Sequence, residues 1–161
     1  MARTKKTNGV HWEQPFQVRD LLKNCLDDAQ PWPPVNNGVY VVSQDSWRGF
    51  PKRKARILYV GGNTGKSPRF LTRVGDLIAD MLGFWWHSSG GQSLYMYCKE
   101  NGLHPLDLYL GWAEGVPCSR CAETEVYWAL GPPELCKKVP AGCKVHLPPL
   151  CACFTLEARV R

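Results

Sequence analysis

The sequence has no run of about 18 apolar residues, so we expect neither a membrane-spanning helix nor a membrane partner. Its basic N-terminus is not followed by an apolar segment, and therefore does not resemble a secretory signal. Without such a signal, the eight cysteines favour a reducing, cytoplasmic environment, in which they are free thiols, core residues or metal ligands. Internal repeats and low-complexity linkers are also missing, so residues 1–161 are predicted to form a single domain.

Acidic residues are missing from the stretch between Ser46 and Gly75, in a chain whose formal net charge is +6. Such uncompensated positive charge predicts a polyanionic partner, although a solvated surface loop is the alternative. The lysines and arginines of this stretch are Arg48, Lys52, Arg53, Lys54, Arg56, Lys66, Arg69 and Arg73. We take all of them except Arg69 as candidate nucleic-acid contacts; Arg69 has a different predicted role.

The remaining composition is that of a folded α+β protein. Hydrophobic residues make up 44% of the chain, and seven of them are tryptophans, which argues against disorder. Two short β-type runs, 38–43 and 56–61, are expected to pair as antiparallel strands across a long basic loop at 44–55. Apolar alternation predicts further strands over 106–112 and 152–160. The expected fold is a small, mainly antiparallel sheet flanked by helices, preceded by a flexible basic arm at residues 1–14.

Apolar periodicity and start and stop signals predict four helices. The first, over 16–26, is expected to place Cys25 in the core. The clearest begins with Ser67 as its cap and Pro68 as its first residue, and runs to about Phe84. The others cover 92–101 and 119–130. The start of the second helix, after the glycine-containing loop 61–67 and with Arg69 in its first turn, is a place where backbone N–H groups can meet a phosphate.

Two tripeptides and an arginine give the chain a family resemblance. Gly38-Val39-Tyr40 is followed by Tyr59-Val60-Gly61, and Arg69 comes ten residues after Tyr59. In this order and spacing the residues resemble the GIY-YIG nuclease family. Glu123, near the start of the last predicted helix, looks like the family's metal-binding glutamate. The resemblance covers residues 36–146, and the loop His87–Gly91 is similar to one in compact bacterial and phage members.

The resemblance implies an endonuclease that uses Mg²⁺ or Mn²⁺ to hydrolyse DNA phosphodiester bonds; RNA is the less expected substrate. It implies that Glu123 holds the metal and that Arg69 binds the scissile phosphate. Tyr40 and Tyr59 would place hydroxyls at the attacking water, and positive neighbours would help to lower the pKa of these tyrosines from about 10. His87 is a candidate proton carrier. A catalytically inactive DNA- or RNA-binding module of the same fold is the alternative.

Each of these residues also has a plainer interpretation. Strand tyrosines are usually core residues, and Glu123 is also interpretable as a solvated helix carboxylate, with Glu125 as its rival for the metal. Arg73, where the family often has histidine or tyrosine, is either a second phosphate contact or a partner of Asp76. The family's asparagine near the last helix is replaced here by Cys136.

A second constellation consists of cysteines and one histidine. Cys118 and Cys121 form a CxxC pair, and Cys143 and His146 form a CxxH pair. Two such tight chelates make a credible tetrahedral site for a structural Zn²⁺ ion, with Cys136 as a substitute ligand. Reduced core thiols are the alternative. A zinc-stabilised protein-interaction domain is accordingly a third interpretation of the whole chain.

Overall fold

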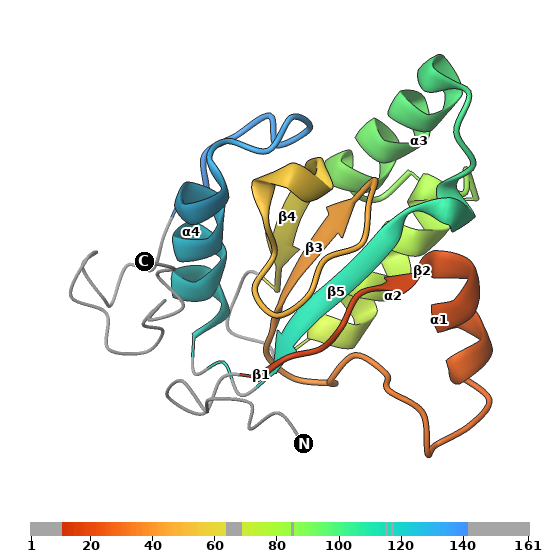
Figure 1. Cartoon of the computed structure of the whole chain (residues 1–161), viewed down its shortest axis with the longest axis vertical. Coiled ribbons are helices and arrows are strands. Elements are labelled where there is room, and N and C mark those ends of the chain that lie inside the picture. The colour runs from red at the N-terminus through yellow and green to blue at the C-terminus, as the bar shows by residue number, and fades with distance from the viewer. Residues whose placement is uncertain (1–10, 64–68, 85, 115, 117, 142–161) are drawn as a thin grey trace.

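A computed structural model describes residues 11–63, 69–84, 86–114, 116 and 118–141 (Figure 1). Within these residues the protein is α+β, with an open antiparallel sheet of five strands and four α-helices. The strands are β1 (His11–Trp12), β2 (Phe16–Gln17), β3 (Val39–Ser43), β4 (Ile57–Gly62) and β5 (Tyr109–Glu114). The helices are α1 (Val18–Asn24), α2 (Phe70–Met81), α3 (Ser89–Asn101) and α4 (Ser119–Leu130), with short 3₁₀ turns at Arg53–Ala55 and Pro105–Asp107.

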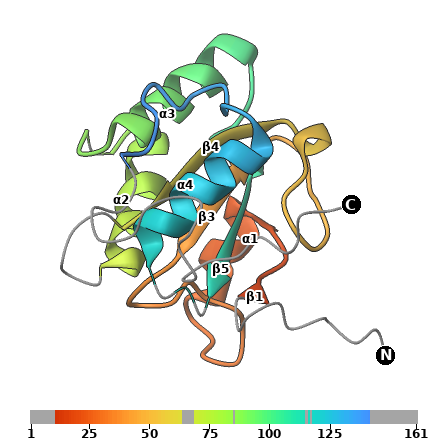
Figure 2. The same cartoon turned by 90° about the vertical axis from the view of Figure 1, so that its left-hand side faces the viewer.

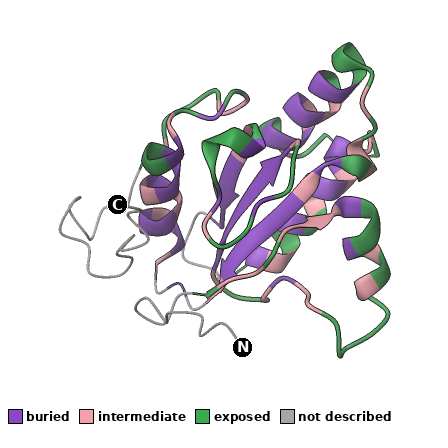
Figure 3. Cartoon of the chain, viewed as in Figure 1, coloured by how far each residue is buried: buried purple, intermediate pink, exposed green. Residues whose placement is uncertain are grey.

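Strand β3 is the centre of the sheet. It pairs with β4 on one side and with β5 on the other, so that Val41 lies opposite both Val60 and Gly111. Strands β1 and β2 pair in turn with β5, which leaves β4 at the opposite edge of the sheet. All five residues of β3 are buried, because helices cover both of its faces (Figure 3).

The two faces of the sheet carry separate apolar cores. One core, around Tyr40, Leu58 and Trp112, packs against α1, α2 and α3. The other, around Val41 and Val60, packs against α4, which lies alone on its side of the sheet (Figure 2). A strand buried on both faces must be apolar at successive positions, which explains the Val-Tyr-Val-Val sequence of β3.

The structure confirms the predicted antiparallel pair and the bounds of α4. Helix α2 begins at Phe70, after Arg69 as its N-cap residue, which makes no side-chain capping bond; the predicted cap Ser67 and first residue Pro68 lie outside the described residues. Helix α3 begins three residues before the predicted start, because the Ser88 side chain accepts a hydrogen bond of 3.0 Å from the Gly91 N–H and caps the helix.

Two predictions about the N-terminal region are wrong. Cys25 is exposed instead of buried, because α1 ends at Asn24 and the chain turns away from the core. His11 and Trp12 do not belong to a free arm, since they pair with Glu114 and Ala113 of β5. Residues 1–10 and the predicted strand at 152–160 lie outside the described residues. Among the described helices, none is both long enough and apolar enough to span a bilayer.

Candidate functional site

Two tyrosines stack where β3 and β4 lie side by side. The ring centroids of Tyr40 and Tyr59 are 6.2 Å apart and their planes differ by 26°. Both rings lie over glycines: a Cβ at Gly61 would be 2.4 Å from the Tyr40 hydroxyl, and a Cβ at Gly90 would be 2.4 Å from Tyr59 Cζ. The glycines of β4 and of the first turn of α3 therefore make the space that the tyrosines occupy.

Glu123 reaches the same end of β4 from α4. A Cβ at Gly62 would lie 3.7 Å from Glu123 Oε2, so the absence of a side chain there lets the carboxylate approach the strand. The start of α4 is tied to the start of β3, because Ser119 Oγ accepts a hydrogen bond of 3.0 Å from the Gly38 N–H. This bond fixes the helix that carries the glutamate against the strand that carries Tyr40.

Partial burial raises the pKa of Glu123 from 4.5 to about 7, although Arg73 and Arg120 oppose this rise. The surroundings of the carboxylate thus disfavour its negative charge. The two arginines offset only part of the free-energy cost of removing that charge from water. A bound cation would favour the ionised form further, and in that respect the surroundings of Glu123 suit a divalent metal ion. Arg120, one turn before Glu123 on α4, was missed by the sequence analysis, although its i−3 spacing is a usable signal.

Arg73 is an arginine of α2 that lies close enough to these groups to affect their ionisation. Its charge acts on the pKa values of Tyr40, Tyr59 and Glu123, in each case against the larger effect of burial. Arg69 is exposed at the N-cap position and is not among the charges that shift these three pKa values. The predicted meeting of Arg69 with the two tyrosines and Glu123 stays a prediction, while Arg73, four residues later, is an arginine whose charge acts on all three groups.

The two tyrosines do not have lowered pKa values. Burial, with smaller effects of neighbouring groups, raises the pKa of Tyr40 well above 10 and that of Tyr59 to about 12. The assistance expected from positive neighbours is present in Arg73 but is outweighed. Both hydroxyls consequently stay protonated near neutral pH, and they are suited to donating and accepting hydrogen bonds, not to acting as phenolate bases.

Cys136 binds the free edge of β4. Its Sγ accepts a hydrogen bond of 3.4 Å from the Val60 N–H and donates one of 3.6 Å to the Val60 carbonyl. The preceding Leu135 N–H donates to the Leu58 carbonyl at 2.9 Å. Burial raises the pKa of the Cys136 thiol to about 11, which keeps it in the protonated form that its donation to the Val60 carbonyl requires. The thiol thus supplies a donor and an acceptor, as the amide of an asparagine would.

His87 precedes α3, where its backbone N–H donates to Asp80 Oδ1 at 3.2 Å. The next N–H, of Ser88, donates to Asp80 Oδ2 at 2.5 Å, so the buried Asp80 holds the chain before the helix. The His87 side chain is exposed, and its predicted role as a proton carrier stays a prediction.

The predicted zinc ligands are only partly within the described residues. Cys118 is the N-cap residue of α4 and Cys121 is buried one turn later, while Cys143 and His146 lie outside the described residues. Across the described ranges, no three His, Cys, Asp or Glu residues form a group that could hold a metal ion, so Cys136 does not join Cys118 and Cys121 as a third ligand. The zinc site stays a prediction.

The candidate nucleic-acid contacts in the β3–β4 loop lie in different surroundings. Arg48, Lys52 and Lys54 line a cleft of about 420 Å³. Arg53 lies elsewhere, with its guanidinium beside Gly131, the residue that ends α4. Arg56 has a left-handed backbone with φ of 53°. Lys66 lies outside the described residues.

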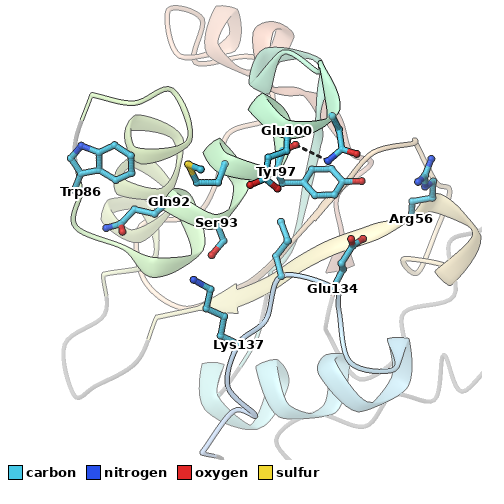
Figure 4. Close-up of a pocket in the computed structure, with 11 residues that line it drawn as sticks. Arg56, Trp86, Gln92, Ser93, Tyr97, Glu100, Glu134 and Lys137 are labelled. Atoms are coloured by element: carbon cyan, nitrogen blue, oxygen red, sulfur yellow. Dashed lines mark hydrogen bonds between the residues drawn. The ribbon is translucent and has the colours of Figure 1, made fainter.

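A second hollow, of about 570 Å³, separates α3 from the segment after α4 (Figure 4). Tyr97 and Trp86 contribute aromatic rings to it, and the Asn101 side chain donates a hydrogen bond of 2.8 Å to the Tyr97 carbonyl. Its lining contains two cations, Arg56 and Lys137, and two anions, Glu100 and Glu134. These charges balance, so the hollow lacks the positive excess that a polyanion requires.

Comparison of the chain with protein-family models, with curated proteins and with solved structures gives no match in any of the three.

Proposed function

We propose that the protein is a metal-dependent endonuclease of the GIY-YIG type, which uses Mg²⁺ or Mn²⁺ to hydrolyse phosphodiester bonds in DNA. The observation that carries the proposal is the cluster of Tyr40, Tyr59, Arg73 and Glu123, which we call the catalytic cluster. Its members come from β3, β4, α2 and α4; Tyr40 stacks on Tyr59, and the charges of Arg73 and Glu123 both act on the pKa values of the two tyrosines. Carboxylates, arginines and tyrosines brought together from distant segments are typical of a phosphoryl-transfer site.

In this proposal Glu123 holds the metal ion alone. Mg²⁺ keeps several waters and often takes only one or two protein carboxylates, so a single glutamate is a sufficient protein ligand. When bound, the metal would stabilise the negative charge that develops on the phosphate and its leaving oxygen. Glu125, two residues along the helix, is not among the charges that shift the pKa values of the cluster, which supports Glu123 in this role.

Arg73 binds the scissile phosphate, because a guanidinium presents a planar fork of donors to phosphate oxygens. Arg120 approaches Glu123 from α4 and is a second cation for the same phosphate. Tyr40 and Tyr59, protonated and fixed by stacking, orient the attacking water through their hydroxyls. Since neither phenol is ionised, the proton of the attacking water passes to solvent and not to a tyrosinate.

Incubation of the protein with supercoiled and branched DNA tests the proposal. We expect nicked or cut products with Mg²⁺ or Mn²⁺ and none with EDTA, and weaker cleavage of a matched RNA duplex. Binding without cleavage under every metal condition would instead favour an inactive nucleic-acid-binding module of the same fold. The absence of both binding and cleavage would leave the zinc-stabilised interaction domain as the remaining interpretation.

A further inference from the structure

The β3–β4 loop is anchored at both its neck and its tip. At the neck, the ladder of the two strands continues, because Gln44 and Asp45 donate backbone hydrogen bonds to Arg56 and Ala55 at 3.1 and 3.0 Å. Towards its tip, Trp47 is 5% exposed and lies on Gly111 of β5, where a Cβ would be only 2.6 Å from Trp47 Cζ2. The loop is therefore folded back on the sheet and presents a defined surface.

That surface contains a cleft of about 420 Å³, which we call the loop cleft. Its lining consists of Ser46, Trp47, Arg48, Lys52 and Lys54. Three of these residues are cations and none is an acid. In the second hollow of this protein the cations are matched by glutamates, so the excess of positive charge is a property of the loop cleft and not of its hollows in general.

Trp47, one of the residues that line the loop cleft, has a polar group that lacks a partner. Trp47 Nε1 is buried and has no hydrogen-bond acceptor among the described residues. A buried donor without an acceptor costs about 1–3 kcal/mol, so such groups usually have a partner that is a ligand, water or ion. An indole N–H, a serine hydroxyl and three cations are together a donor set for an anion, and the three positive charges disfavour a cation.

We propose that the loop cleft binds a phosphate group of the nucleic acid, as an anchoring site separate from the catalytic cluster. This inference rests on the proposed function for the identity of the polyanion. Arg48, Lys52 and Lys54 supply the charge, and the Trp47 N–H and Ser46 hydroxyl supply directional hydrogen bonds. Contacts to phosphate fix the position of a duplex and do not select its sequence.

The place of the loop cleft suits one nucleic acid bound at two points. Trp47 belongs to the apolar core under α4, the helix that carries Glu123, so the loop cleft and Glu123 adjoin the same face of the sheet, whereas Tyr40 and α2 pack on its other face. The loop leaves β3 at the end opposite to Gly62, five residues of β4 away, which is about 17 Å at 3.3 Å per residue. A duplex that reaches both sites must therefore cover about 17 Å, which is about five base-pair steps along its axis.

The test follows the Trp47 indole N–H by two-dimensional ¹H–¹⁵N NMR while a short DNA duplex is added to the Glu123→Gln variant, which keeps the DNA intact. Trp47→Phe identifies the resonance, since the chain has seven tryptophans. We expect this resonance to shift and saturate with the duplex, and to shift in the same direction, at higher concentration, with inorganic phosphate. Trp47→Phe itself is expected to weaken DNA binding by roughly tenfold, the loss of one charge-assisted hydrogen bond.

A salt titration of DNA affinity provides the second measurement. The double variant Lys52→Gln, Lys54→Gln should reduce the slope of log affinity against log salt by about 1.8, because each lysine that contacts a phosphate contributes about 0.9. The matched control is Lys23→Gln, Lys99→Gln, which removes the same charge from α1 and α3 and should leave the slope nearly unchanged.

The results separate this inference from the proposed function. A shifting Trp47 resonance and a reduced slope for the loop variant alone support the loop cleft, even if the wild-type protein does not cleave DNA. If DNA binds while the Trp47 resonance stays in place, or if the two double variants have equal slopes, the loop cleft is not a phosphate site, even if cleavage is efficient. A shift caused by inorganic phosphate but not by the duplex would also overturn the proposal.

Discussion

The catalytic cluster and the loop cleft differ in how the chain builds them. The cluster joins β3, β4, α2 and α4, and it mixes one carboxylate, two phenols and an arginine in partly buried surroundings that raise three pKa values. The loop cleft comes from a single segment, contains only cations as charged groups, and is exposed apart from Trp47. Cleavage of a phosphodiester requires both acidic and basic side chains, which the fold brings together from distant segments. Attraction of a polyanion requires only positive charge on an anchored loop.

The largest expected effect is that of Glu123→Gln, which keeps the size of the side chain and removes its charge. Metal binding should fail and cleavage should fall by several orders of magnitude, while DNA affinity persists or rises because a negative charge near the phosphate is gone. Cleavage assays with Mg²⁺ and binding assays with EDTA measure the two effects. Glu125→Gln is the control on the same helix and should be nearly silent; a reversed outcome would move the metal site by half a turn.

Arg73→Ala and Arg69→Ala compare two arginines one turn apart. Arg73→Ala should reduce cleavage about 10²- to 10³-fold, the usual loss when a charge-stabilising group is removed from an active site. Arg69→Ala, at the exposed N-cap, should cost only a fewfold and mainly through affinity. Single-turnover rates at saturating DNA separate the two effects. If Arg69→Ala abolishes the chemical step and Arg73→Ala does not, the assignment made from the structure is wrong.

The raised pKa of Glu123 predicts a pH-dependent gain in stability for Glu123→Gln. In the unfolded chain this carboxyl ionises near 4.5 and in the folded protein near 7, so the native protein loses stability as the pH rises between these values. Removal of the charge should therefore raise the melting temperature at pH 8 by about 3 °C and leave it nearly unchanged at pH 4.5. Thermal unfolding at both pH values, without metal, measures the difference. An equal rise in melting temperature at both pH values would mean that ionisation of Glu123 does not destabilise the folded protein.

The smallest expected effect is that of Arg53→Gln, a change in the β3–β4 loop outside the loop cleft. The Arg53 guanidinium lies beside Gly131 at the carboxyl end of α4, where a cation is favoured by the helix dipole. Arg53→Gln should lower the free energy of unfolding by about 0.5 kcal/mol and change the salt dependence of DNA binding less than Lys52→Gln does. Chemical denaturation measures the first effect. If Arg53→Gln and Lys52→Gln change the slope of log affinity against log salt equally, Arg53 also contacts the nucleic acid.

The parts of the fold that the sequence predicts are those in which local pattern and tertiary packing agree. The Gly-Val-Tyr and Tyr-Val-Gly runs became β3 and β4, and the apolar face of α2 lies in the core as expected. Helix α3 began earlier than predicted, since Gly90 and Gly91 resemble a loop in sequence. Tertiary contacts explain their place in a helix: Tyr59 packs against one glycine and Asp80 against the other.

The candidate site was predictable in its strands but not in its helix α2. Tyr40 and Tyr59 are marked by the glycine triplets, and Glu123 by its place in the last helix. Arg69 and Arg73 are four residues apart and share one face of the predicted helix, so helical periodicity does not distinguish between them. The raised pKa values of the tyrosines depend on burial among residues distant in the sequence, which no local pattern reports.

The bonds of Leu135 and Cys136 to β4 have a consequence for self-association. A strand at the edge of a sheet offers unpaired N–H and C=O groups to any other strand, and this is a common route to aggregation. Here the Leu58 carbonyl and both backbone groups of Val60 are already occupied, two of them by a single sulfur. The thiol thereby blocks strand pairing at the β4 edge of the sheet. Loss of the two bonds of that sulfur would free the N–H and the carbonyl of Val60 for pairing with a second molecule.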